Sequence, residues 1–473
     1  MGELLSAALD SPLVGLLLAL LIGLLVRLLL SRGPWRPPAP PCIRGWIPWL
    51  GAALQMGKAP LEFIESAREK LGPVFTIFAA GNRLTFVYGE EGISTFFTSK
   101  KVDFPQAVQK PVQHTASIVK DDFFKKHSEI HEALKLQLSQ KHLERNAAGL
   151  YNEFCSHMQL LGSQGTEPLY SLVRQVMYPA VVDTLFGKGT CPTSKDSLKE
   201  FEEHFQKFDE GFEYGSQLPE IFLRDWSQSK QWLLRLFKKI VSEVEGKAPC
   251  EEDSKTLYHH VLKILNGTAT YNNSLLLLWA SQANAIPIAF WTLAFILSHP
   301  LIYKDAMDEI SSVLGKQISA ITEADLRKIP FIKMCVLEAL RLRSPGAITR
   351  KVMEPLKIYN YQIPPGDLLM LSPYWLHRDP KRFPEPDKYK PERWKKANLE
   401  KNVFLDGFVA FGGGKYQCPG RWFALMEIHM LVVLFLYKYE FHLLDPVPDQ
   451  SNLHLVGTQQ PDGPCRVTYK MRR

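Results

Sequence analysis

Segments with a helical hydrophobic period occupy most of this chain of 473 residues. In ten of them, apolar residues recur every three or four positions or strong helix formers dominate, and both patterns predict helices. No linker separates these segments after residue 41, so we expect one large domain over residues 42–473, where length alone suggests two or three. The ten segments are 61–71, 122–143, 170–185, 198–212, 225–244, 254–265, 274–297, 301–313, 323–342 and 421–437.

Strand patterns are few and short. Turns near them carry Gly and Pro, and prolines are dense from Pro364 to Pro391, which predicts irregular coil there. The fold class is therefore mainly α with a small β portion, an α+β domain with a long meandering loop. The expected strands are 74–78, 84–88, 356–361 and 368–371.

The N-terminus carries a long apolar run. Residues 12–30 are apolar except for Arg27, and a spanning helix needs about 20 such residues. Arg27 lies near one end of the run, where its side chain can reach the headgroups. We expect residues 1–31 to be a single-pass membrane anchor. The alternative is a cleaved signal peptide, but the run lacks a basic region before it and a small-residue cleavage site after it.

The flanks of this run predict its orientation. Glu3 and Asp10 precede the run, whereas Arg32 and Arg36 follow it, so the positive-inside rule predicts a cytosolic C-terminal domain. Residues 32–41 are rich in proline and predict a stiff linker. The net charge of +7 suits an anionic membrane surface or an acidic partner, and is too small and too evenly spread to indicate nucleic-acid binding.

The strongest chemical signal is a glycine-rich loop that ends in a cysteine. Residues 411–420 contain three consecutive glycines, then Cys418, and a helix is expected from about residue 421. Amide groups at a helix N-terminus stabilise a thiolate, and Lys415 adds a positive charge nearby. The chain has seven cysteines and no CxxC pair, which argues against a disulfide framework or a zinc site.

The loop has two other interpretations. A phosphate-binding loop would need Gly at position 409 and Ser or Thr at position 416, where the chain has Val409 and Tyr416. A buried structural cysteine beside a glycine turn is common and stays open on the loop alone.

The loop resembles the haem-binding motif of the cytochrome P450 family, Phe-x-x-Gly-x-Arg-x-Cys-x-Gly. Phe411, Gly414, Cys418 and Gly420 match it, whereas Tyr416 stands where the family has an arginine that contacts a haem propionate. The resemblance covers essentially the whole chain. It implies a haem b whose iron is bound by the Cys418 thiolate.

The resemblance also implies which residues surround the haem. Phe411, Gly414 and Lys415 belong to the cofactor-binding loop, and Lys415 is expected to compensate for the missing arginine. Arg350 matches a propionate-binding arginine of the family. His127 and His131 align with positions that often carry Trp and Arg, although a lone histidine is more often a surface residue.

A second motif, Glu338-Ala-Leu-Arg341, lies in a helix with an apolar surround. Glu and Arg three positions apart share one helix face, and such pairs usually form a solvated surface. The resemblance adds Arg393 as a third member of a buried network that holds the cysteine loop.

The expected helix 274–297 contains a departure from the family. The family usually has an acid followed by an alcohol where this chain has Ala283 and Asn284, and Pro287 is expected to kink the helix and free the carbonyl of Ala283. Asn284 is predicted to support bound dioxygen. The alternative is an ordinary buried amide that is satisfied locally.

The asparagine resembles the branch of the family that holds steroid 7α- and 12α-hydroxylases and prostacyclin synthase. Residues 58–65, 213–220 and 391–401 carry the likeness to the sterol enzymes. It implies hydroxylation of an oxysterol, 24-hydroxycholesterol, at the 7α position in bile-acid and cholesterol metabolism. An isomerase of the prostacyclin-synthase kind and a sterol-binding haem protein without turnover stay open as alternatives.

The family implies O2 as co-substrate, NADPH electrons delivered by the NADPH–cytochrome P450 reductase, and residence in the endoplasmic reticulum membrane. Four lysines are expected to meet acidic residues of that reductase, and a solvated face is the alternative. They are Lys395, Lys396, Lys401 and Lys415.

Three segments are expected to line an apolar substrate pocket, namely 105–119, 212–222 and 283–288. They are rich in apolar residues and contain few cations, with Lys110 as the obvious one. This composition favours a sterol with hydroxyl groups over an anionic fatty peroxide.

Overall fold

The computed structural model describes residues 38–246, 256–315, 320–399, 401, 403–451 and 457–472. The predicted anchor, 1–31, and most of the predicted linker, 32–41, lie outside these residues. Within the described part, Thr270–Ser298 is the one helical stretch that is long and apolar enough to cross a membrane. Because 72% of its most apolar window is buried, it is a core helix of the domain.

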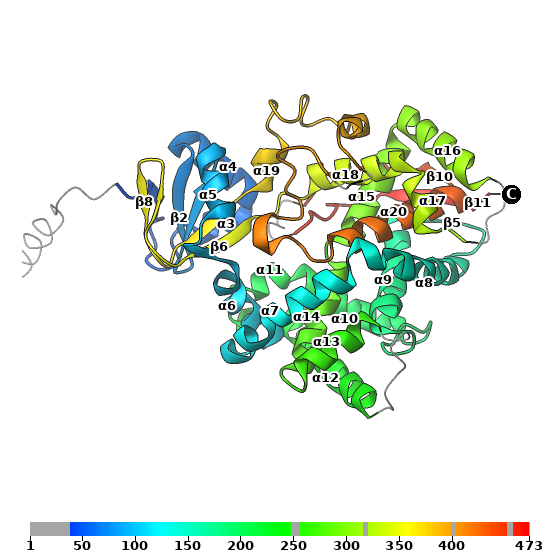
Figure 1. The fold of residues 1–473 in the computed structure, drawn as a ribbon, viewed down its shortest axis with the longest axis horizontal. Helices are drawn as coiled ribbons and strands as arrows, with labels where there is room; N and C mark the ends of the chain where they lie inside the picture. Colours follow the sequence, from blue (N-terminus) through cyan, green and yellow to red (C-terminus); the bar gives the residue numbers. More distant parts are fainter. Residues whose placement is uncertain are drawn as a thin grey trace, which may run out of the picture.

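Helices dominate the described chain, as the hydrophobic period predicts. Most of them lie together on one side of the molecule, which is the right-hand part of Figure 1. The α-helices are α3 (Ala53–Lys58), α4 (Pro60–Leu71), α5 (Gly89–Thr98), α6 (Phe104–Ala116), α7 (Lys120–Gln137), α8 (Gln140–Gln159), α9 (Leu169–Phe186), α10 (Leu198–Glu210), α11 (Phe212–Gly215), α12 (Arg224–Glu245), α13 (Leu257–Leu265), α14 (Thr270–Gln282), α15 (Ala285–Ser298), α16 (Pro300–Leu314), α17 (Glu323–Arg327), α18 (Pro330–Arg343), α19 (Pro373–His377) and α20 (Arg421–Lys438), and the 3₁₀ turns are η1 (Glu220–Phe222), η3 (Pro391–Lys396) and η4 (Gly414–Tyr416).

A six-stranded sheet and a two-stranded hairpin lie at the other end of the molecule, whereas a three-stranded sheet lies among the helices near the C-terminus (Figure 1). The large sheet has the order β1-β2-β3-β9-β6-β4, and the smaller ones are β10-β11-β5 and β7-β8. The strands are β1 (Cys42–Ile43), β2 (Val74–Ala79), β3 (Asn82–Val87), β4 (Val102–Asp103), β5 (Gln164–Pro168), β6 (Ile348–Val352), β7 (Leu356–Ile358), β8 (Tyr361–Ile363), β9 (Leu368–Leu371), β10 (Tyr439–Leu443) and β11 (Arg466–Met471).

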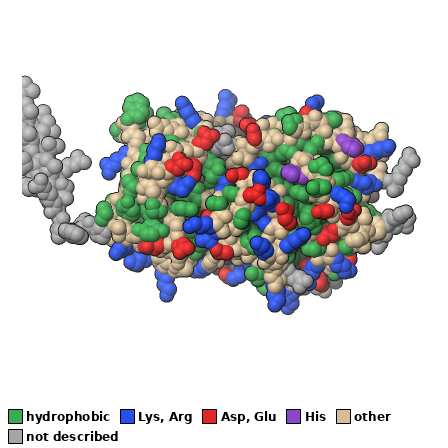
Figure 2. Space-filling model, turned by 90° about the horizontal axis from the view of Figure 1, so that it is seen from above, with side chains coloured by type: hydrophobic (Ala, Val, Ile, Leu, Met, Phe, Trp, Pro, Cys, Tyr) green, Lys and Arg blue, Asp and Glu red, His purple; other side chains and the backbone are tan. Residues whose placement is uncertain are grey.

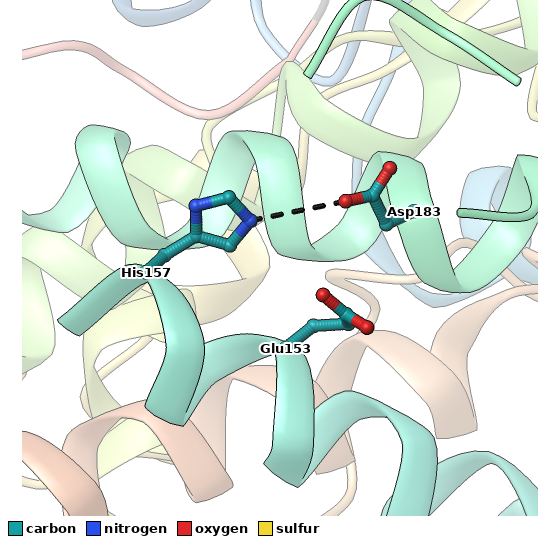
Figure 3. Close-up of side chains that lie close together, drawn as sticks. All are labelled: Glu153, His157 and Asp183. Carbon is teal, nitrogen blue, oxygen red and sulfur yellow. Dashed lines mark ion pairs between the residues drawn. The ribbon is translucent and has the colours of Figure 1, made fainter. Parts of the chain in front are cut away.

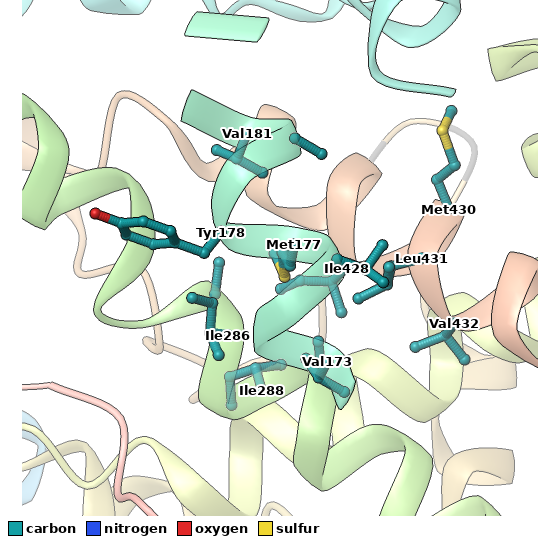
Figure 4. Packing of buried hydrophobic residues seen from close by; sticks show 14 of the residues in the cluster. Val173, Met177, Tyr178, Val181, Ile286, Ile288, Ile428, Met430, Leu431 and Val432 are labelled. Atoms are coloured by element: carbon teal, nitrogen blue, oxygen red, sulfur yellow. The ribbon is translucent and has the colours of Figure 1, made fainter. Parts of the chain in front are cut away.

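The main core lies where α9, α15 and α20 meet. Figure 4 shows Met177 of α9, Ile286 of α15 and Leu431 of α20 packed in this region, and Met177 and Leu431 are fully buried. Helix α20 begins three residues after Cys418. Burial of α20 in the core therefore fixes where the cysteine loop ends.

Three of the predicted helices are wrong in extent, because the hydrophobic period continues through a break in the helix. The segment 122–143 divides between α7 and α8, and 274–297 divides between α14 and α15. The segment 323–342 divides before Pro330, whose ring favours the first turn of a new helix. Both helices of each pair bury their apolar faces, so the period alone does not reveal the break.

The predicted strand 356–361 is also wrong in extent. Tyr359 has a φ of 52°, a left-handed conformation that turns the chain, so the segment forms the hairpin β7–β8. The sequence did not predict α5, α6 or several strands, including β6. Helix α5 and strand β6 are short, and α6 contains Pro111.

Hydrophobic side chains gather on the surface at the end where the described chain begins, whereas acidic and basic side chains mix over much of the rest (Figure 2). Trp46 is 85% exposed, Trp49 64% and Leu54 60%. Large exposed apolar groups in one region mark a contact surface.

Candidate functional site

The cysteine loop closes tightly before α20. The N–H of Cys418 donates to the carbonyl of Phe411 over 2.9 Å. Gly412 and Gly414 have φ values of 69° and 65°, which L side chains rarely adopt. A Cβ on Gly414 would lie 3.1 Å from the carbonyl oxygen of Phe97, so the loop needs glycine both for its turn and for its contact with α5.

The sulfur of Cys418 has opposing influences on its pKa. Burial raises the pKa, whereas the N–H groups of Gly420 and Arg421 and the charge of Arg421 lower it. The ammonium of Lys415, the predicted nearby positive charge, lies 5.3 Å from the ring centre of Tyr416. Two amides at the start of α20 and a guanidinium are what an anionic sulfur ligand requires.

The structure brings Glu338, Arg341 and Arg393 into one buried network. Arg341 donates to both carboxylate oxygens of Glu338, over 3.0 and 2.8 Å, and Arg393 donates to Oε1 over 2.9 Å. The N–H of Lys390 and the indole of Trp394 complete five hydrogen bonds to this carboxylate. Glu338 and Arg341 are both 0% exposed, so these bonds replace water at the charged groups.

His377 links this network to the cysteine loop. Its Nδ1 donates to the carbonyl of Arg341 over 3.1 Å, and its Nε2 accepts the N–H of Val409 over 3.0 Å. Burial, followed by the charge of Arg341, lowers the pKa of His377 to about 3, which keeps the ring neutral. The carbonyl of Val409 accepts the N–H of Gly412 over 2.8 Å, so the path from Arg341 to the glycine turn is continuous.

Arg350 lies in a cage of aromatic rings beside the same loop. Its guanidinium carbon is 5.1 Å from the ring centres of Phe96, Phe104 and Tyr416. It donates to the carbonyl of Thr349 and forms no ion pair with any described residue. Tyr416 stands where the family motif has an arginine. Here its ring packs against Arg350, so an arginine still lies beside the cysteine loop.

The two histidines occupy different environments. The ring centres of His127 and Phe104 lie 6.2 Å apart. The buried Nε2 of His127 has no hydrogen-bond partner among the described residues. Burial lowers the pKa of His127. His131 lies 6.5 Å from the His127 ring and 3.8 Å from the carboxylate of Glu132.

The cysteine loop and its surroundings fit a haem group. Arg350, which has no ion pair among the described residues, and the imidazole of His127, whose Nε2 has no described partner, both border Phe104. Arg350 also borders Tyr416, two residues from the thiol. Such donors suit two propionates, and the thiol suits the iron.

Asn284 lies in the break between α14 and α15. Its Oδ1 accepts the N–H of Thr458 over 2.9 Å. The described hydrogen bond of the Asn284 side chain is therefore to a loop far away in the sequence, and not to the carbonyl of Ala283. Pro287 has no N–H for that carbonyl, which fits the observed interruption of the helix. Asn284 is exposed, and it lines a cavity together with Ala283.

This cavity, which we call the Asn284 cavity, also holds an acidic residue that the sequence did not single out. Asp209 of α10 accepts the indole N–H of Trp279 and the amide N–H of Gln460, both over 3.0 Å. Burial raises the pKa of Asp209 to about 6. The described lining residues are Asp209, Phe212, Glu213, Trp279, Ala283, Asn284, Gly457, Thr458 and Gln460.

A second cavity lies between the segments 105–119 and 212–222. Its lining includes Gln113 and Leu218, as the predicted substrate segments require, and also Lys230 of α12. Lys230 lies outside the three segments expected to line the pocket, and its side chain is 1% exposed. Its ammonium lies 2.7 Å from Glu220, so its charge is paired.

Glu153, His157 and Asp183 form the one described group with metal-ligand spacing, since their ligand atoms lie within 4.8 Å of one another (Figure 3). The protein already supplies partners for both carboxylates. Lys188 contacts Glu153 over 2.9 Å, and Thr193 donates to Asp183 over 2.7 Å. We therefore assign this group to packing between α8 and α9.

Sequence comparisons identify relatives along nearly the whole chain. The family model described as "Cytochrome P450" matches residues 40–467. The chain is 54% identical to the 24-hydroxycholesterol 7-alpha-hydroxylase of Homo sapiens, over 92% of this chain and 94% of that protein. It is 30% identical to the human 7-alpha-hydroxycholest-4-en-3-one 12-alpha-hydroxylase, over 94% of each chain.

A structural comparison supports the same fold. The retinoic-acid-bound cyanobacterial CYP120A1 superposes with a TM-score of 0.75, at 18% identity, over 93% of this chain and 100% of that one. At this identity the likeness concerns the fold alone.

Proposed function

This chain belongs to the cytochrome P450 family, and on that premise we propose that it is a haem-thiolate monooxygenase that hydroxylates 24-hydroxycholesterol at the 7α position. The high identity with the human hydroxylase along nearly the whole chain carries the proposal of the substrate. The cysteine loop, the arginine cage and the buried glutamate network support the proposal of the cofactor.

We propose that Cys418 binds the iron and that Arg350 and His127 donate to the haem propionates, with His131 as a further donor near that edge. Phe411, Gly414 and Lys415 would shape the loop around the cofactor. When bound, the haem supplies O2 activation, and electron donation by the thiolate promotes O–O cleavage. The network of Glu338, Arg341 and Arg393 acts as support, and His377 transmits that support to the loop.

Asn284 is proposed to hold a proton-bearing group near the reacting oxygen. Its Oδ1 already accepts the Thr458 N–H, which leaves the amide Nδ2 as its available donor. A carboxamide does not ionise near neutral pH, so Asn284 would orient a water molecule or the dioxygen and not act as an acid.

Replacing Asn284 by leucine is expected to lower coupled turnover by about 100-fold, near the lower end for loss of a proton-transfer group. Peroxide release per NADPH should rise at the same time. Asn284→Asp is the control for the structural role, because it retains an acceptor for Thr458 and removes the amide donor. If Asn284→Leu uncouples turnover and Asn284→Asp does not, the amide donor is not needed, and the role of Asn284 is to anchor the Thr458 loop.

We propose that residues 1–31 anchor the protein in the endoplasmic reticulum membrane, that 32–41 form the linker and that 42–473 form the cytosolic catalytic domain. The exposed Trp46, Trp49 and Leu54 lie close in sequence to the proposed linker, which is consistent with a membrane near that end.

The reductase is proposed to dock on exposed lysines around the cysteine loop. Lys395, Lys396, Lys401 and Lys415 are all exposed, and the first two lie on the turn η3 that also carries Arg393. Charged groups at the rim of an interface mainly accelerate the encounter.

Reversing the charge of Lys395 and Lys396 to glutamate is expected to slow reductase association by about 10-fold at low ionic strength. The effect should shrink as salt is added, because exposed charges are screened. Lys263→Glu, at an exposed lysine of α13, is the matched control. An equal loss in both variants, or a loss that salt does not change, would rule out docking at η3.

An isomerase of the prostacyclin-synthase kind is the competing function, since Asn284 replaces part of the usual proton-transfer pair. Incubation of the anchored enzyme with reductase, NADPH and 24-hydroxycholesterol is expected to give the 7α-hydroxylated product, identified by chromatography and mass spectrometry. Conversion of prostaglandin endoperoxide alone, without NADPH, would favour the isomerase. Sterol binding without a product would favour a binding protein.

A further inference from the structure

The Asn284 cavity contains a half-buried carboxylate, that of Asp209, that no cation contacts among the described residues. Asp209 forms no ion pair with any described residue. The nearby Arg174 contacts Glu202 over 3.0 Å and acts on Asp209 only at longer range, where its charge lowers the pKa of the carboxyl. Among the described lining residues none is a lysine or arginine, and Glu213 adds a second acidic side chain. A desolvated carboxylate without a counterion is costly unless hydrogen-bond donors surround it.

The surroundings of Asp209 hold it in one orientation. Trp279 donates to Oδ1 and Gln460 donates to Oδ2, so each oxygen is fixed by a separate donor. Tyr170 donates to the amide oxygen of Gln460 over 3.2 Å, which turns the amide N–H toward Asp209. The Trp279 ring is stacked on Phe212 at 3.7 Å between centres, which limits movement of the indole donor.

The carboxylate retains capacity for a further donor. An ionised carboxylate offers about four lone-pair positions, and Trp279 and Gln460 occupy one on each oxygen. Because burial raises the pKa of Asp209 only to about 6, the group is an acceptor near neutral pH. A neutral O–H would fill a vacant lone pair without adding charge, whereas an anionic group of the ligand would be repelled by the carboxylate of Asp209.

We propose that Asp209 is a specificity-determining residue that accepts a hydrogen bond from a hydroxyl group of the ligand and excludes ligands with an anionic group at that end. The ligand class is therefore a neutral, hydroxyl-bearing apolar molecule. This inference rests on the proposed function, because it names the contact by which the same site would select an oxysterol over a fatty-acid-like ligand.

The test is spectral titration of the ferric holoenzyme with matched ligands. One pair is a sterol whose side chain ends in an alcohol and the same sterol ending in a carboxylate. The other pair is cholesterol and cholesterol sulfate, which differ at the ring end. The variants are Asp209→Asn and, as control, Glu203→Gln, which removes an exposed charge from the same helix.

Wild type and Glu203→Gln are expected to prefer the alcohol over the anion in at least one pair. Asp209→Asn should weaken binding of that alcohol by about 10-fold or more, as expected for a lost hydrogen bond to a charged group, and should strengthen binding of the anion. Equal changes for alcohol and anion, or no change for either, would overturn the inference.

A second variant guards against a folding defect in Asp209→Asn. Trp279→Phe retains an aromatic ring against Phe212 and removes one donor to Asp209, so it is expected to keep or increase the preference for the alcohol. Loss of the preference in this variant would contradict the proposed role of the carboxylate.

The result also separates this inference from the proposed function. If 24-hydroxycholesterol neither binds nor turns over, yet the alcohol preference exists and depends on Asp209, the substrate proposal fails and the inference stands. If the oxysterol is 7α-hydroxylated equally well by wild type and Asp209→Asn, with unchanged affinities, the inference fails and the substrate proposal stands.

Discussion

Replacing Cys418 by serine is expected to abolish the thiolate-type Soret band of the reduced carbon monoxide complex and all sterol hydroxylation. A serine hydroxyl keeps the size of the side chain, but its pKa is far too high for the amides of Gly420 and Arg421 to stabilise an anion. A hard oxygen is also a poor substitute for a polarisable sulfur as an electron donor to iron.

Difference spectra of purified wild type and variant, recorded at equal haem content, check this prediction. Cys155→Ser is the matched control, because Cys155 is a half-buried thiol on α8 whose partners are Lys438 and Tyr151. A Cys418→Ser protein that kept both the thiolate band and activity would remove Cys418 from the site.

Replacing Glu338 by glutamine is expected to destabilise the protein by about 3–5 kcal/mol and to reduce haem retention sharply. Glutamine retains the shape but loses the charge, so the buried guanidinium of Arg341 keeps only part of its compensation. Glu338 accepts five hydrogen bonds, so the amide N–H₂ of the glutamine would point at N–H donors and could not accept their hydrogen bonds.

Denaturant unfolding and the haem-to-protein ratio measure these two effects. Glu392→Gln, at an exposed carboxylate on η3, is the control and should leave both unchanged. A stable Glu338→Gln protein that retained wild-type haem content would show that the network does not hold the cysteine loop.

The sequence predicted the parts of this site that lie close together along the chain. The glycine turn and Cys418 fall within ten residues, and the spacing of Glu338 and Arg341 places them on one helix face. The helical period also indicated most of the helices, because amphipathic faces leave a regular pattern.

The residues that the sequence did not indicate act across long separations. His377 has no local motif, and its importance appears only when Arg341 and Val409 are brought to either side of it. Asp209 is one acid among several on an amphipathic helix, and only the contacts of Trp279 and Gln460 distinguish it.

The prediction for Lys415 shows the same limit. Closeness in sequence predicts that its charge acts on the thiol, whereas the charge that lowers the pKa of Cys418 is that of Arg421 at the start of α20. Side-chain direction after a tight turn depends on the fold, so proximity along the chain did not decide between the two cations.

Turnover under oxygen labelled with ¹⁸O tests the central claim most directly. The anchored enzyme, with reductase, NADPH and 24-hydroxycholesterol, is expected to give a 7α-hydroxylated product that carries one labelled oxygen atom, measured by mass spectrometry. A product without label, or product formation that needs neither NADPH nor O2, would contradict the assignment as a monooxygenase.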